Sequence, residues 1–165
     1  MATHKLLLEL EEELDEYILL AIHCSEEAYK VAFMLNKQLL IQLKRNPSDL
    51  DFIYPTNQAS YPLFYFQNKQ KYLEYFLVGN CSKTILKNDN QEKTSLFSNS
   101  NSEKTLTNYL LPEYQQVDFF LKISSELETI SSKVLVSSIN EIPQVISAYV
   151  VDLHTIKLKD NLIFN

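Results

Sequence analysis

The chain has 165 residues, of which 45% are hydrophobic, and it carries 21 acidic against 15 basic residues for a formal net charge of −6. This length predicts one domain, residues 1–165, with a substantial core. The acidic balance argues against binding to nucleic acid or to an acidic membrane surface, because affinity for phosphates comes from clustered Lys and Arg. No apolar run approaches the roughly 18 residues of a membrane span.

The glycine and cysteine content excludes several further classes of protein. Gly79 is the only glycine, whereas phosphate-binding loops and the GxSxG turn of hydrolases need several, since only Gly lets the backbone approach so closely. The cysteines, Cys24 and Cys81, are too few for a disulfide framework and are expected to be reduced thiols. The first residues are not typical of a secretory signal, because Glu9 interrupts the apolar run 6–8. We therefore expect a cytoplasmic protein.

The N-terminal part predicts two strands and a helix. Residues 4–10 favour a strand, although a helix is the competing interpretation because apolar residues between 7 and 18 also fall on one helical face. Residues 17–23 form a short apolar run that is typical of a buried strand. Ser25 is then expected to be the N-cap of a helix over 25–40. The buried face of this helix is expected to contain Ala28, Val31, Ala32, Leu35 and Leu39.

A region rich in aromatic residues follows a turn at 46–49. Two apolar runs, 63–67 and 73–78, flank a short polar stretch and predict an antiparallel hairpin. Stacking on nucleic-acid bases is disfavoured because the only basic residues in the region are Lys69 and Lys71. We expect instead an exposed aromatic face that contacts a protein partner. The aromatic residues are Phe52, Tyr54, Tyr61, Phe64, Tyr65, Phe66, Tyr72, Tyr75 and Phe76.

The C-terminal part predicts a strand–helix–strand unit. The first strand covers 117–123, and Ser124 or Ser125 is expected to cap the helix that follows. Pro143 ends this helix, and the last strand is expected over 145–153. The buried face of the helix is expected to contain Leu127, Ile130 and Val134.

Residues 87–107 are polar and rich in Asn and Ser, which predicts a long mobile loop. The elements around this loop run as strand, helix, strand, hairpin, and then strand–helix–strand. This order predicts an α+β domain, in which two helices pack on one face of a mostly antiparallel sheet. Ferredoxin-like topology is the leading expectation.

Residues 111–119, LPEYQQVDF, resemble the signature of the IPExxxVDY family of small bacterial proteins. A Leu replaces the Ile of that signature and a Phe replaces its Tyr, and both changes preserve apolar character. The resemblance extends over nearly the whole chain, including Leu35-Asn36 in the predicted helix and the KDNLIF ending. It implies an uncharacterised bacterial protein, and the motif carries no chemistry of its own. The matching positions are Leu111, Pro112, Glu113, Val117, Asp118 and Phe119.

The two carboxylates of this motif invite an acid/base interpretation. In an extended segment Glu113 and Asp118 would lie about 16–17 Å apart and on opposite faces. General acid/base partners must reach one substrate, so extension excludes the pair, and only a tight turn over 113–117 would restore it. We expect a turn followed by a core strand. The residues of that strand expected to face the core are Val117, Phe119, Leu121 and Ile123.

Other reactive side chains predict no site. His23 and Cys24 are adjacent, but neighbours on a strand point to opposite faces, which excludes a thiolate–imidazole dyad. The potential metal ligands lack any familiar spacing, so no metal or other cofactor is expected. These ligands are His4, His23, Cys24, Cys81 and His154. A charged cluster near the C-terminus is expected to be a solvated tail. It comprises Asp152, His154, Lys157, Lys159 and Asp160.

These observations favour a non-catalytic protein-interaction or adaptor module. Its partner, either another protein or a second copy in a homodimer, would bind at a sheet edge or at the aromatic face. A second hypothesis is a small-metabolite-binding regulatory domain, because residues 142–153 (IPQVISAYVVDL) resemble the last strand of ACT-like domains. An enzyme is the least favoured class, since the sequence contains no catalytic motif.

Overall fold

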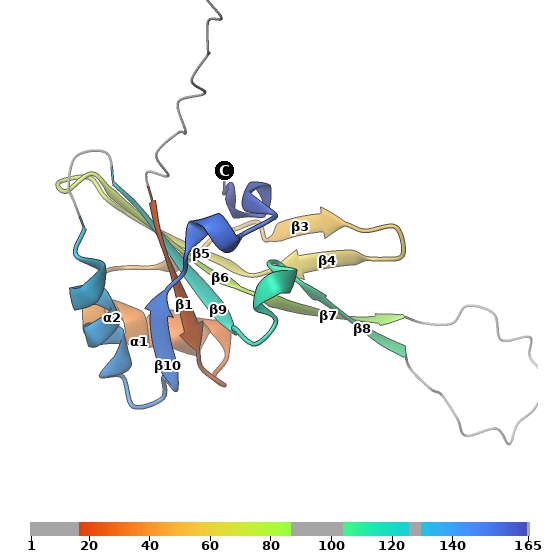
Figure 1. The fold of residues 1–165 in the computed structure, drawn as a ribbon, viewed down its shortest axis with the longest axis horizontal. Coiled ribbons are helices and arrows are strands. Elements are labelled where there is room, and N and C mark those ends of the chain that lie inside the picture. The colour runs from red at the N-terminus through yellow and green to blue at the C-terminus, as the bar shows by residue number, and fades with distance from the viewer. Residues whose placement is uncertain (1–16, 87–103, 126–129, 165) are drawn as a thin grey trace, which may run out of the picture.

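The computed structural model describes residues 17–86, 104–125 and 130–164 (Figure 1). Within these ranges, a six-stranded antiparallel sheet with the order β10-β1-β9-β6-β5-β2 forms the centre. Its strands are β1 (Tyr17–His23), β2 (Lys44–Arg45), β5 (Leu63–Asn68), β6 (Leu73–Gly79), β9 (Phe119–Ser125) and β10 (Ser147–Val150).

Two hairpins extend away from the central sheet (Figure 1). One joins β3 (Leu50–Ile53) to β4 (Gln58–Tyr61), and the other pairs β7 (Cys81–Leu86) with β8 (Lys104–Tyr109). The predicted loop over 87–107 is therefore wrong at its C-terminal end, because residues 104–107 belong to β8 and pair with β7. Residues 87–103 lie outside the described part of the chain.

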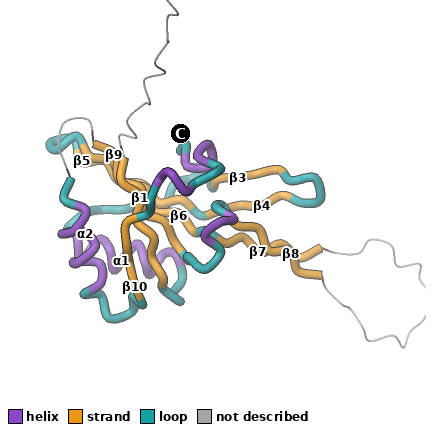
Figure 2. The backbone as a smooth tube through the Cα atoms, viewed as in Figure 1, coloured by secondary structure: helices purple, strands orange, loops and turns teal. Residues whose placement is uncertain are grey.

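Two α-helices, α1 (Ala28–Leu39) and α2 (Ser132–Asn140), pack on the same face of the sheet (Figure 2). Val31, Ala32 and Leu35 of α1 are buried there, and Ile139 of α2 joins them. Their spacing is the apolar stripe expected of a helix that covers a sheet. The predicted α+β class, with a mostly antiparallel sheet and two helices, is confirmed.

Both helices begin later than predicted. The residue that precedes α1 is Glu27 rather than Ser25, and it makes no side-chain capping bond. Ser125 is the last residue of β9, and Ser131 precedes α2. The strand continues because β9 lies between β1 and β6, where ladder hydrogen bonds on both sides outweigh a local capping preference. Val134 is 63% exposed and so does not belong to the buried face.

Further differences from the predicted elements concern the two ends of the chain. The last strand, β10, is shorter than the predicted range 145–153. The predicted strand over 4–10 and the helical residue Leu127 lie outside the described residues. No helix in the described ranges is long and apolar enough to cross a membrane.

The second face of the sheet carries a core of its own. Residues of the β3–β4 hairpin contribute to it, together with three short 3-10 helices, η1 (Pro112–Tyr114), η2 (Leu153–Thr155) and η3 (Lys159–Leu162). The five charged residues of the predicted solvated tail are exposed, as expected, but apolar residues within and after this cluster are buried. These residues are Ile156, Leu162 and Phe164.

The aromatic region contributes to this packing rather than to an exposed face. Tyr61, Phe64 and Tyr75 are buried, and most of the other rings are partly buried. Tyr72, 52% exposed, is the only one of the nine predicted rings whose side chain is classed as exposed. The expectation of an exposed aromatic face is therefore wrong, because the hairpin is covered on both sides by other elements.

Asparagine side chains occupy both edges of the central sheet. The amide of Asn140, at the end of α2, donates to the carbonyl of Ala148 at 2.9 Å and accepts from its N–H at 2.8 Å. At the opposite edge, Asn36 of α1 makes the same pair of bonds with Leu43, at 3.0 and 2.6 Å. Each side chain binds both backbone groups of one residue at or next to an edge strand, so those groups are not free to pair with another chain.

Candidate functional site

The motif segment 111–119 is organised by one buried residue, Asn80, which follows β6. Its side-chain amide donates to the carbonyls of Tyr114 at 2.8 Å and Val117 at 3.0 Å. Its side-chain oxygen accepts from the N–H of Leu111 at 2.9 Å. The backbone of Asn80 also donates to the carbonyl of Asp118 and accepts from Leu110. This network folds the segment into η1 and a turn before β9.

The expected turn before a core strand is confirmed, although β9 begins at Phe119 rather than at residue 117. Each motif carboxylate binds a distant backbone N–H. Glu113 accepts from Lys157 at 2.7 Å, and Asp118 accepts from Cys24 at 2.9 Å. These bonds join the segment to the C-terminal residues and to the end of β1. The two carboxylates thus hold different parts of the fold.

The apolar motif residues belong to the core, as do the residues expected to face it. Leu111 and Val117 are buried on the second face, and Phe119 is buried on the helix face. Pro112 opens η1, where its fixed φ suits the first helical position. Leu121 and Ile123 are fully buried in β9.

His23 and Cys24 do not form a couple. The Cys24 thiol donates to the carbonyl of Gln144 at 3.3 Å, while the His23 ring stacks on Tyr149 with a centroid separation of 5.7 Å. Burial raises the pKa of Cys24, which disfavours the thiolate. Within the described ranges, no three His, Cys, Asp or Glu residues gather as metal ligands, and His4 lies outside them.

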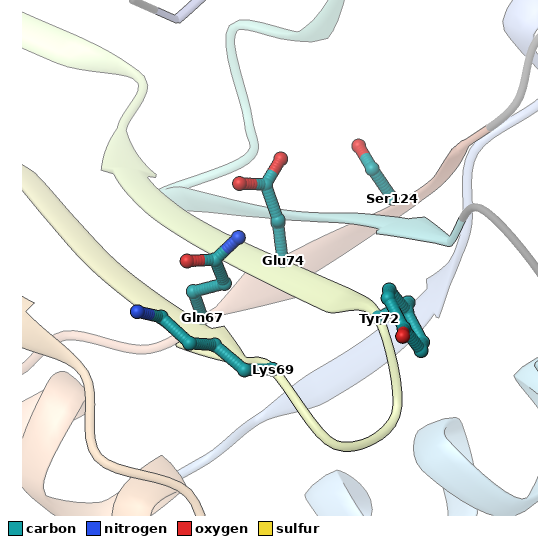
Figure 3. A pocket seen from close by; sticks show the side chains of 5 residues that line it. All are labelled: Gln67, Lys69, Tyr72, Glu74 and Ser124. Atoms are coloured by element: carbon teal, nitrogen blue, oxygen red, sulfur yellow. The ribbon is translucent and has the colours of Figure 1, made fainter.

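A pocket of about 350 Å³ lies at the hairpin end of β5 and β6 (Figure 3). Gln67, Glu74 and Ser124 form one row across β5, β6 and β9, since each is the direct partner of the next. Their side chains therefore project from one face of the sheet, as Figure 3 shows for Glu74 and Ser124. Lys69 and Tyr72 complete the lining from the turn between the two strands.

Glu74 is held in place by Tyr65, a residue outside the pocket lining. The hydroxyl of Tyr65, on β5, donates to Oε1 of Glu74 at 2.7 Å. Burial, together with this hydrogen bond, raises the pKa of Tyr65 to about 12. This bond orients the carboxylate of Glu74.

Beside this row and on the same face of the sheet, Lys122 of β9 is surrounded by aromatic rings. Its ammonium lies 4.6 Å from the ring centroid of Tyr17 and 5.3 Å from that of Phe164. It also donates to the carbonyl of Leu162 at 2.8 Å. Burial lowers the pKa of Lys122, and the nearby charge of Glu74 opposes this effect. Lys122 thereby fastens the C-terminal residues to the sheet.

Sequence reasoning missed Asn80, the pocket and the ring-enclosed Lys122. In the sequence, Asn80 is a polar residue directly after an apolar strand. This pattern is typical of a surface turn, so it predicts an exposed side chain rather than a buried one. Searches of protein families, of curated proteins and of solved structures found no match to this chain.

Proposed function

We propose that this chain is a non-catalytic interaction module that binds an acidic protein surface through α1. The observation that carries the proposal is one exposed apolar stripe. Tyr29 and Phe33, 63% and 68% exposed, lie one turn apart on α1 and about 40° from each other around its axis. Leu40, 90% exposed, follows at the end of the helix. Large apolar side chains gathered on one surface mark interaction sites more often than scattered ones do.

The charge around this stripe favours an acidic partner. Residues 28–45 contain no Asp or Glu, although the chain as a whole carries a net charge of −6. Two carboxylates that contact α1, those of Glu26 and Glu141, are bound by Lys30 and Gln38. The salt bridges between described residues join Lys30 to Glu26 and Arg45 to Asp49, and Lys37 takes part in neither. An ammonium beside exposed rings complements a surface that presents carboxylates around apolar side chains. The basic residues of the segment are Lys30, Lys37, Lys44 and Arg45.

Leu40 supports the proposal through its backbone. It ends α1 with φ 54°, the left-handed conformation that Gly or Asn adopts at lower cost. An exposed Leu in that conformation is unfavourable for both the backbone and the solvent-facing surface. Strain of this kind gathers at functional positions, where another interaction compensates for it.

The surfaces expected from the sequence suit a partner less well. At the sheet edges, Asn36 and Asn140 already bond to the main chain of Leu43 and Ala148. The rings of the β5–β6 region are largely covered. We therefore place the interaction on the helix layer rather than on the edges or the hairpin.

A site-specific crosslinking experiment tests this proposal. A photoreactive amino acid replaces Phe33, and Val150, which is 46% exposed on β10, serves as the matched control. We expect Phe33 alone to crosslink an acidic protein, and we expect binding of that purified protein to weaken about tenfold or more in Tyr29→Ala/Phe33→Ala and at high salt.

Identical crosslinks from both positions would contradict the proposal, as would unchanged affinity in the double variant. Crosslinking to a second copy of the chain would assign the stripe to a homodimer instead.

A second candidate function is a small-molecule-binding regulatory domain, which the pocket beside Glu74 favours. The fold arrangement is compatible with it. We propose ferredoxin-like topology for the core, supported by the strand order β10-β1-β9-β6 and by the helices that connect β1 to the later strands and β9 to β10. A ligand-stabilisation screen separates the two functions, because a metabolite that binds only the folded state raises the unfolding temperature.

We also propose membership in the IPExxxVDY family and a bacterial, cytoplasmic setting. The family proposal rests on the residues that match the signature, which are Leu111, Pro112, Glu113, Val117, Asp118 and Phe119. The cytoplasmic setting is supported by the two free thiols, Cys24 and Cys81.

A further inference from the structure

We infer that the pocket at the β5–β6 hairpin binds a small zwitterion of the amino-acid class. This inference rests on the second candidate function above and is independent of partner binding by α1. The pocket is large enough for such a ligand, at about 350 Å³, which lies within the range of small-molecule sites.

Two opposite charges line the pocket. Glu74 supplies a carboxylate whose Oε1 already accepts from Tyr65 at 2.7 Å, and Lys69 supplies an ammonium from the turn. The carboxylate suits the ammonium group of a ligand, and the lysine suits its carboxylate. A ligand that carries both groups can pair with Glu74 and Lys69 at once, whereas a simple amine or a simple acid can pair with only one of them.

Uncharged polar groups lie beside Glu74. Gln67 and Ser124 are its cross-strand neighbours on either side, and all three line the pocket. An amide and a hydroxyl both donate and accept hydrogen bonds, so they can bind either end of a zwitterion. This row stands on three neighbouring strands, which position it more rigidly than loops would.

The turn that carries Lys69 and Tyr72 is held in one conformation. The side chain of Asn68 accepts from the N–H groups of Gln70 and Lys71 at 3.1 and 3.2 Å. Tyr72 adopts φ 53°, a left-handed conformation that is costly for an aromatic residue. Its ring lines the pocket, where it can contact the apolar part of a ligand.

Amide NMR titration of the isotope-labelled full chain tests the inference. The probes are common amino acids, each compared with its N-acetyl form, which lacks the ammonium, and with its carboxamide, which lacks the carboxylate. We expect saturable shifts in residues 67–74 and at Ser124 with an amino acid, and about tenfold weaker binding of both derivatives, since each loses a charge-assisted hydrogen bond.

Charge variants then test which group of the ligand Glu74 and Lys69 each bind. Glu74→Gln should weaken binding of the amino acid about tenfold without changing that of its N-acetyl form. Lys69→Gln should weaken binding of the amino acid without changing binding of its carboxamide. Lys71→Gln is the matched control, because Lys71 is exposed and does not line the pocket. Ser124→Ala provides a second test that does not disturb the Tyr65–Glu74 bond.

The outcomes separate the inference from the function on which it rests. Derivatives that bind as tightly as the parent amino acid would overturn the zwitterion class while leaving a small-molecule site in place. If no amino acid or derivative shifts these residues, the inference is wrong. If a wider set of metabolites also fails to raise the unfolding temperature, the regulatory function is wrong as well.

Discussion

The N–H of Leu111 donates to the side-chain oxygen of Asn80 at 2.9 Å, and both residues are completely buried. This bond joins the end of β6 to the start of the motif segment, 31 residues further along the chain. Because the same Asn80 side chain also binds two carbonyls of the segment, the motif is built around a residue outside it.

We predict that Asn80→Ala destabilises the fold by about 3 kcal/mol or more, because it leaves one buried N–H and two carbonyls without their partner. Urea unfolding of the variant beside the parent measures the change. Asn108→Ala is the control, since the side-chain nitrogen of Asn108 is buried without a hydrogen-bond partner among the described residues. Equal losses in the two variants would contradict the role of Asn80.

Within the motif, we expect Phe119→Ala to cost about 3–5 kcal/mol, because it removes a buried ring and leaves a cavity. Glu113→Ala should cost about 1 kcal/mol or less, since its bond to the Lys157 N–H is exposed. Denaturant unfolding of both variants gives the comparison. A complementation assay in a strain that lacks the gene accompanies it. Should Glu113→Ala alone abolish complementation while Phe119→Ala unfolds like the parent, the motif is a site and not a structural unit.

Replacing Leu40 by Gly should raise the free energy of unfolding by about 0.5–1 kcal/mol, because Gly adopts the left-handed conformation without a Cβ clash. The 90% exposed side chain contributes little packing to the folded chain. Lys37→Gly, inside α1, should instead lower the free energy of unfolding by about 1 kcal/mol. Thermal unfolding distinguishes the two, and a destabilised Leu40→Gly would show that the Leu side chain packs.

At alkaline pH we expect the fold to lose stability, and Tyr65→Phe to reduce that loss. The folded-state pKa of Tyr65 is about 12, above its ordinary value of 10.0, because burial and then the Glu74 hydrogen bond favour the protonated form. Its contribution is therefore fully present below pH 10 and is lost as the pH rises through about 12. Urea unfolding at pH values on both sides of this window measures the slope. Tyr29→Phe, at an exposed position, serves as the control, and equal slopes in the two variants would contradict the assignment.

The sequence by itself determined the elements whose signal is local. The apolar run of β1, the helical spacing of Val31, Ala32 and Leu35, and the two runs of the β5–β6 hairpin all appear at the predicted places. Each of these patterns repeats over a few residues, because a strand or helix alternates its own buried and exposed sides. The α+β class followed from their order.

Only the tertiary structure decided the rest. Asn80 bonds to residues 31 to 37 positions away, and Asn140 occupies a sheet edge that the helix reaches only after packing. The C-terminal residues show no hydrophobic periodicity. Their apolar side chains are buried because they pack on the second face of the sheet, where Lys122 donates to the carbonyl of Leu162. Hydrogen bonds and packing between distant segments leave no periodic trace, so polar residues such as Asn80 are indistinguishable in sequence from ordinary turn residues.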